Sequence, residues 1–186
     1  MTKIIEHLEE ATIRFAGDSG DGMQLVGSQF SETSGFAGNE VNTFPDYPSE
    51  IRAPEGTLYG VSAFQIHFGT QHIHTSGDHI DVLVAMNASS LKVNMANLKP
   101  GGIIIANIEG FDERNLTLAK YAVNPLTDGS LAKYDVHAID MTKEIKAELK
   151  ELNVPSKVIS KTKNIFALGL AYWLFNRPLQ PTVDWI

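Results

Sequence analysis

A glycine-rich stretch near the start of the chain, residues 17–22 (Gly-Asp-Ser-Gly-Asp-Gly), constrains the fold more than any other feature. It follows a run typical of a strand, residues 11–16, and precedes apolar residues at helical spacing. Asp21 is placed to cap the first amides of that helix, and Gly35 or Gly38 to end it. The stretch therefore predicts a strand–loop–helix unit, the building block of parallel α/β sheets.

Further along the chain, runs typical of strands alternate with segments of helical periodicity. The expected strands are residues 40–44, 58–68, 80–86, 103–106 and 135–139, and the expected helices are residues 88–98, 142–152 and 164–175. A turn at residues 69–71 is expected to fold the chain back through Ile73 as an antiparallel hairpin. The alternation predicts an α/β fold, a three-layer α/β/α sandwich with a mostly parallel, Rossmann-like sheet and this hairpin.

Composition limits where the chain can work and what it can bind. Its 15 Lys and Arg against 22 Asp and Glu give a net charge of −7, which opposes binding to nucleic acid or anionic membrane. No cysteine is present, so any iron–sulfur cluster must be ligated by another chain. The acidic start lacks the apolar core of a signal peptide, and no apolar run reaches the ~20 residues that a membrane span needs. We expect one cytoplasmic domain over residues 1–186, and the apolar C-terminus favours a continuation into a longer fused subunit.

The glycine loop favours a phosphate, because amides at a helix start lie at the positive end of the helix dipole. Its G-x-x-G-x-G order nevertheless differs from the G-x-G-x-x-G of dinucleotide-binding folds, and the nearest acid, Glu40, stands at the beginning of the second strand. Asp18 and Asp21 would repel an anion unless each carboxylate is turned into a cap or a partner contact. A second interpretation is that the glycines serve only a tight turn and close packing.

Two other groups of residues suggest binding. Four histidines gather around the expected hairpin, and they favour a solvated surface over a zinc site: His67, His72, His74 and His79. The expected last helix is apolar almost all round, so we expect most of it in the core, with Trp173 and Trp185 in contact with a partner.

Four further segments carry a family resemblance: residues 44–54, 58–62, 81–87 and 98–102. Together with the glycine loop, and in the same order, they resemble the gamma subunit or domain of 2-oxoacid:ferredoxin oxidoreductases. The Ser-Glu-Ile-Arg-Ala-Pro form of residues 49–54 looks most like the 2-oxoglutarate-type enzymes, in which this domain is fused ahead of a thiamine-binding domain. Many members carry Arg-Gly-Gly where this chain has Arg52, Ala53 and Pro54.

The resemblance implies a place in a larger complex. Such a complex decarboxylates a 2-oxoacid on thiamine diphosphate and magnesium, passes electrons through iron–sulfur clusters to ferredoxin, and releases an acyl-coenzyme A. The gamma-type domain would not carry this chemistry, so the isolated chain is expected to be inactive. It would pack against the thiamine-binding alpha and beta subunits or domains and help to bind coenzyme A.

The resemblance also indicates the residues expected near the coenzyme. They are those of the glycine loop: Gly17, Asp18, Ser19, Gly20, Asp21 and Gly22. Arg52 is expected to pair with a phosphate, and a structural salt bridge with Glu50 or Glu55 is an equally supported alternative. No residue is expected to be catalytic or to bind a metal. Two alternatives stay open: a free-standing NAD-dependent dehydrogenase, and an assembly scaffold whose loop contacts only protein.

Overall fold

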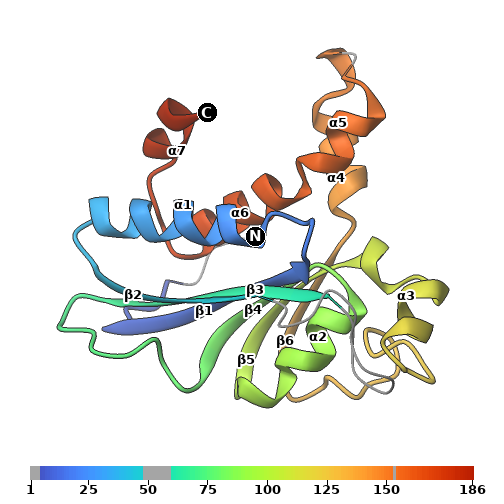
Figure 1. Cartoon of the computed structure of the whole chain (residues 1–186), viewed down its shortest axis with the longest axis horizontal. Helices are drawn as coiled ribbons and strands as arrows, with labels where there is room; N and C mark the ends of the chain where they lie inside the picture. Colours follow the sequence, from blue (N-terminus) through green and yellow to red (C-terminus); the bar gives the residue numbers. More distant parts are fainter. Residues whose placement is uncertain (1–4, 48–59, 153) are drawn as a thin grey trace.

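A mixed six-stranded sheet runs through the computed structural model, which describes residues 5–47, 60–152 and 154–186 (Figure 1). Its strands are β1 (Glu10–Asp18), β2 (Glu40–Asp46), β3 (Val61–Gly69), β4 (Ile80–Ala85), β5 (Leu98–Asn107) and β6 (Asp135–Ile139). They are ordered β2-β3-β1-β4-β5-β6. β1, β4, β5 and β6 pair in parallel, and β3 pairs antiparallel with both β1 and β2.

Helices cover both faces of this sheet (Figure 1). They are α1 (Met23–Phe36), α2 (Ala88–Asn94), α3 (Glu113–Leu118), α4 (Met141–Glu148), α5 (Ser156–Lys161), α6 (Lys163–Leu174) and α7 (Gln180–Trp185), with short 3₁₀ turns at Met95–Asn97, Ile108–Phe111 and Lys150–Leu152. α1 and α6 lie on one face, and α2 and α3 lie on the other (Figure 1). The predicted three-layer sandwich with a mostly parallel sheet and an antiparallel pair is confirmed.

Each face of the sheet has its own apolar core. Successive strand residues point to opposite faces, so Phe15 joins the core beneath α1 and α6 while its neighbour Ala16 joins the core on the α2 side. Phe30 of α1 lies at the centre of the first core, with its ring centroid 5.3 Å from that of Phe68 and 5.9 Å from that of Tyr172. Truncating such a fully buried aromatic ring costs about 3–5 kcal/mol, so Phe30 fixes α1 over the sheet.

The expected return of the chain through Ile73 is wrong. Residues 70–79 form a loop without a strand, and the antiparallel partners of β3 are β1 and β2. Side chains satisfy the backbone of this loop in place of a ladder: Glu40 Oε2 accepts from Ile73 N at 3.0 Å, and Gln65 Nε2 donates to the Ser76 and Gly77 carbonyls at 2.6 Å. Among the residues described, no helix combines the length and apolarity that a membrane span requires.

Candidate functional site

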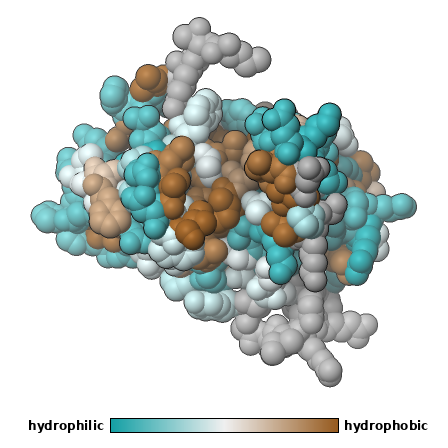
Figure 2. All heavy atoms as spheres, turned by 90° about the horizontal axis from the view of Figure 1, so that it is seen from above, coloured by the Kyte–Doolittle hydropathy of each residue, from teal (hydrophilic) through white to brown (hydrophobic). Residues whose placement is uncertain are grey.

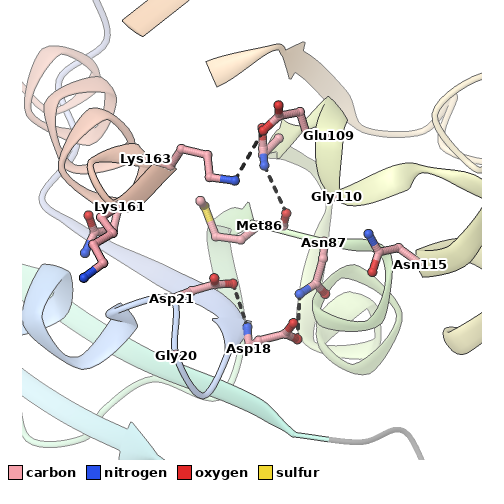
Figure 3. Close-up of a pocket in the computed structure, with 12 residues that line it drawn as sticks. Asp18, Gly20, Asp21, Met86, Asn87, Glu109, Gly110, Asn115, Lys161 and Lys163 are labelled. Carbon is pink, nitrogen blue, oxygen red and sulfur yellow. Dashed lines mark hydrogen bonds and ion pairs between the residues drawn. The ribbon is translucent and has the colours of Figure 1, made fainter. Parts of the chain in front are cut away.

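A crevice opens where the loops after β1 and β4 leave the sheet toward opposite faces. α1 packs into one core and α2 into the other, although the strands that precede them are parallel neighbours. Ligands of open α/β sheets bind at such switch points, beyond the carboxyl ends of the strands. A cavity of about 480 Å³ lies there, lined by Asp18, Gly20, Asp21, Met86, Asn87, Asn107, Glu109, Gly110, Asn115, Lys161, Lys163 and Asn164 (Figure 3).

The glycine loop supplies one wall of this crevice, but it uses several of its own amides. Asp18 N donates to Asp21 Oδ2 at 2.8 Å, Ser19 N to Gly60 O at 3.0 Å, and Asp21 N to Asp18 O at 2.9 Å. The prediction that Asp21 caps α1 is therefore wrong. Gly22 is the N-cap, so no side chain caps the first amides of the helix. The left-handed backbone of Gly22, with φ 73°, separates Asp21 from the helix, and the Asp21 carboxylate turns back to the end of β1.

Two of the loop glycines are required by close packing. A Cβ on Gly17 would lie 2.7 Å from Asp21 Oδ2, and one on Gly22 would overlap the Asn164 side chain at the start of α6. Gly20 differs, because a Cβ there would meet nothing within 4 Å. The packing interpretation thus holds for Gly17 and Gly22, while Gly20 is exposed and borders the crevice.

Asp18 is held by a neighbouring strand end. Asn87 Nδ2 donates to Asp18 Oδ1 at 2.8 Å (Figure 3). Asn87 Oδ1 accepts from Ser90 N at 2.8 Å in a capping box that starts α2. Burial at the crevice raises the pKa of the Asp18 carboxyl, repulsion from Asp21 raises it further, and the bond from Asn87 partly opposes both. Both loop carboxylates therefore accept hydrogen bonds from the protein. This is the condition under which an anion is expected to approach the loop.

The opposite wall comes from α5, α6 and the turn after β5, and it carries both cations of the lining. Lys163 Nζ lies 3.3 Å from Glu109 Oε2 (Figure 3). The same oxygen also accepts a hydrogen bond from Thr142 Oγ1. Lys161 lines the same wall at the end of α5. The composition gave no signal for these lysines, because nothing in the sequence shows that the start of α6 meets the glycine loop.

The floor is formed by residues that end β4 and β5. Asn107 is only 2% exposed; its Nδ2 donates to Met86 O at 3.4 Å, and its Oδ1 has no hydrogen-bond partner among the residues described. Asn87 and Asn115 add two further carboxamides to the lining. A search for polar residues immediately after buried parallel strands could have found Asn87 and Asn107.

Arg52 lies outside the described residues, as do Glu50 and Glu55. Its pairing with a phosphate and the alternative salt bridge both stay predictions. Of the loop residues predicted to lie near the ligand, Asp18, Gly20 and Asp21 line the crevice.

The acid that a dinucleotide site would require lies far from the crevice. Glu40 and Glu10 are both in register with Gly69, so Glu40 lies level with the beginning of β1. The crevice lies at the other end of that strand, beyond Asp18, roughly 26 Å away at the rise of a strand. Glu40 is also engaged by His72, with 2.7 Å between Oε1 and Nδ1. The arrangement disfavours the NAD-dependent alternative.

The histidines lie outside the crevice. His67 Nδ1 is 2.8 Å from Thr75 O, and the rings of His72 and His74 stack with centroids 6.2 Å apart. Within the described part of the chain, no three His, Asp or Glu side chains converge on a position that could hold a metal ion. The zinc alternative therefore has no support there.

Comparison with known proteins finds a matching family model, a curated relative and two solved structures. The family model described as pyruvate ferredoxin/flavodoxin oxidoreductase matches residues 12–186. The 2-oxoglutarate oxidoreductase subunit KorA of Mycobacterium tuberculosis (strain ATCC 25618 / H37Rv) is 47% identical over 175 residues, which cover 94% of this chain and 27% of KorA. The chain thus spans about a quarter of the length of this curated relative.

Two solved structures share the fold. The 2-oxoglutarate:ferredoxin oxidoreductase from Magnetococcus marinus, with 2-oxoglutarate, coenzyme A and succinyl-CoA bound, is 23% identical with a TM-score of 0.64, covering 89% of this chain and 24% of that one. The gamma subunit of the keto/oxoacid ferredoxin oxidoreductase from Geobacter sulfurreducens PCA is 19% identical with a TM-score of 0.58, covering 88% of this chain and 74% of that one.

Proposed function

The chain belongs to the pyruvate ferredoxin/flavodoxin oxidoreductase family, and we propose that it is the gamma-type domain of a 2-oxoglutarate:ferredoxin oxidoreductase. In this proposal residues 1–186 form the N-terminal part of a longer cytoplasmic subunit, which oxidatively decarboxylates 2-oxoglutarate to its acyl-coenzyme A together with its partners. Thiamine diphosphate, its magnesium ion and the iron–sulfur clusters belong to other domains. The absence of cysteine supports this division, because the chain cannot supply thiolate ligands to a cluster.

The crevice is the observation that carries a coenzyme A role. It is large enough for part of an extended ligand, and one wall carries Lys161 and Lys163 opposite the exposed Gly20. The carboxylates of Asp18 and Asp21 are engaged by Asn87 Nδ2 and by the Asp18 amide, which reduces their repulsion of a phosphate. In this role the residues bind and orient the coenzyme.

Assembly is the second part of the proposal, and exposed apolar residues support it. Trp173 of α6 is 63% exposed and Trp185 of α7 is 53% exposed, whereas Tyr172 beside Trp173 is buried. Figure 2 shows apolar side chains gathered at the centre of the face seen from above, the side of the sheet that α1 and α6 cover. We propose that the thiamine-binding domains pack against this face, and that ferredoxin reaches the complex through those partners.

A reconstitution experiment tests the proposal. The full chain is purified alone and co-expressed with thiamine-binding partner subunits, and 2-oxoglutarate-dependent ferredoxin reduction is measured with and without coenzyme A. The chain alone should be inactive, and the assembled complex should be active only with coenzyme A. Turnover by the isolated chain would contradict the proposed division of labour.

Calorimetry separates the alternatives. Saturable binding of coenzyme A to the complex, reduced when Arg52 or Lys163 is replaced, supports the proposed role. Binding of NADH by the chain would favour the dehydrogenase. Assembly and activity with unaltered coenzyme A affinity in both variants would favour a scaffold.

A further inference from the structure

The crevice has two chemically different regions. The wall at the end of α5 and the start of α6 carries Lys161 and Lys163. The floor, at the ends of β4 and β5 and the start of α3, carries the carboxamides of Asn87, Asn107 and Asn115. Cations attract phosphates through charge, whereas neutral carboxamides recognise groups that donate and accept hydrogen bonds. A ligand that spans both regions is therefore expected to bind in one direction.

Asn107 determines which kind of ligand group the floor favours. The orientation of its carboxamide is set by Met86 O, because the reverse orientation would bring two acceptor oxygens together. Asn107 Oδ1 is then a buried acceptor that has no partner within the described part of the chain. A buried acceptor without a partner is unfavourable, so this oxygen favours a ligand that brings an N–H or O–H group.

The other polar atoms beside the floor point to the same kind of ligand. Asp18 and Asp21 place carboxylate oxygens, which accept hydrogen bonds, at the end of β1 beside the floor. A diphosphate has only acceptor oxygens and would meet acceptors here. A neutral amide, which donates through its N–H, suits the floor better.

The composition of the lining distinguishes the two donor-bearing parts of coenzyme A. Adenine and the pantetheine arm both carry N–H groups, but adenine sites usually include an aromatic ring on which the base stacks. None of the described residues that line the crevice is aromatic. The floor therefore favours the flexible pantetheine arm, with its two amides, over the base.

We propose, on the premise that the crevice binds coenzyme A, that pantetheine donates an amide N–H to Asn107 Oδ1 while the phosphates lie at Lys161 and Lys163. The coenzyme then crosses the ends of β4 and β5 with its phosphates toward α6. Asn87 stays with Asp18 and Ser90, and Asn115 adds a second carboxamide to the pantetheine region.

Fragment binding to the assembled complex tests this direction. Coenzyme A, 4′-phosphopantetheine and adenosine 3′,5′-bisphosphate are titrated calorimetrically into wild type, Asn107→Leu and Lys163→Met. Asn107→Leu should weaken coenzyme A and phosphopantetheine about tenfold, the size of one lost hydrogen bond, and leave the bisphosphate unchanged. Lys163→Met should weaken all three ligands and reduce the dependence of their affinity on salt.

Two controls and one replacement variant make each result decisive. Lys146→Met, an exposed lysine of α4, should change no affinity, and thermal unfolding should show that Asn107→Leu retains the wild-type fold. If that variant fails to fold, Asn115→Leu replaces it, with the same expected selectivity for the pantetheine ligands.

Two different failures can be told apart. Bisphosphate weakened by the asparagine variants, with phosphopantetheine unaffected, would overturn the direction while leaving coenzyme A binding in place. Wild type that binds none of the three ligands would overturn the proposed function itself.

Discussion

Asn87 Nδ2 donates a hydrogen bond of 2.8 Å to Asp18 Oδ1, and this bond joins the carboxyl ends of two neighbouring parallel strands. The other end of the same carboxamide accepts from Ser90 N and starts α2. One side chain therefore fixes both the direction in which the chain leaves β4 and the position of the acid at the end of β1. The crevice depends on this link, because α1 and α2 diverge on either side of it.

Asp18→Asn should raise the thermal stability of the chain at neutral pH. The pKa of Asp18 is raised in the folded state above its ordinary value of 3.8, chiefly by burial, so its ionised form is disfavoured by folding. The wild-type free energy of unfolding therefore falls as pH rises from near 3.8 through the raised pKa, and the loss is complete above it. The asparagine variant does not ionise, so its free energy of unfolding does not fall in this way, and its Oδ1 can still accept a hydrogen bond from Asn87 Nδ2. Unfolding temperatures measured from below pH 3.8 to neutral pH should show a gap between the two proteins that widens as the pH rises past 3.8 and stays constant once Asp18 is ionised in the folded protein.

Asp78→Asn provides the control, because this residue is exposed in the loop before β4. Its stability difference from wild type should not change in the same direction across the range. A gap for Asp18→Asn that narrows with rising pH would show that Asp18 is stabilising when ionised.

Gly27→Ala should destabilise the packing of α1 on the sheet. Gly27 is buried in the second turn of this helix, and a Cβ there would overlap the ring of Phe64 on β3. Moving the helix away is expected to cost about 1–3 kcal/mol. Gly35→Ala is the matched control: it lies in the same helix with nothing within 4 Å of its Cβ, and it should stabilise by about 0.5–1 kcal/mol. Urea unfolding measures the change in the free energy of unfolding for both variants. Equal changes would show that helix propensity alone determines the effect of each substitution.

Gly22→Ala should loosen the junction between the glycine loop and α6. Its left-handed backbone costs about 1–2 kcal/mol with a side chain, and the new Cβ also overlaps Asn164. Asn164→Ala removes that overlap but leaves the backbone strain, so a double-mutant cycle should give a coupling of about 0.5–1 kcal/mol. Gly20→Ala, whose Cβ meets nothing, should stay within about 0.5 kcal/mol of wild type. Additive effects at positions 22 and 164 would mean that the two residues do not constrain each other.

The strand pattern of the sequence was sufficient for most of the fold, because burial on both faces leaves a local signature. Residues 80–86 read as a parallel core strand and form β4, which ends at Ala85. Strand partners were harder to predict. The pairing of β3 with β1 and β2 depends on contacts across residues distant in sequence, and the loop at 70–79 owes its form to Glu40 and Gln65.

One wall of the candidate site, with Asp18, Gly20 and Asp21, could be predicted from the sequence in the same way. The glycine loop lies at the end of a strand, and position along a strand is a local property. Lys161 and Lys163 reach the crevice only because α6 crosses the sheet beside α1, and no local pattern encodes that crossing. The hydrogen-bond donor to the Asp21 carboxylate was predicted wrongly for the same reason, because the turn at Gly22 determines where the Asp21 carboxylate points.

Glu109→Gln should tighten the binding of coenzyme A. Glu109 holds Lys163 by an exposed ion pair and places a negative charge on the wall that the phosphates are proposed to occupy. Such a pair is worth about 0.2–1 kcal/mol, so its removal should improve affinity by up to about fivefold at low salt and less at high salt. Glutamine can still accept from Thr142, which keeps α4 in place. Calorimetry at two salt concentrations measures the change, with the exposed Glu144→Gln as the control for net charge. Weaker binding would mean that the carboxylate positions Lys163 for the ligand, because a purely competing charge cannot reduce affinity when it is removed.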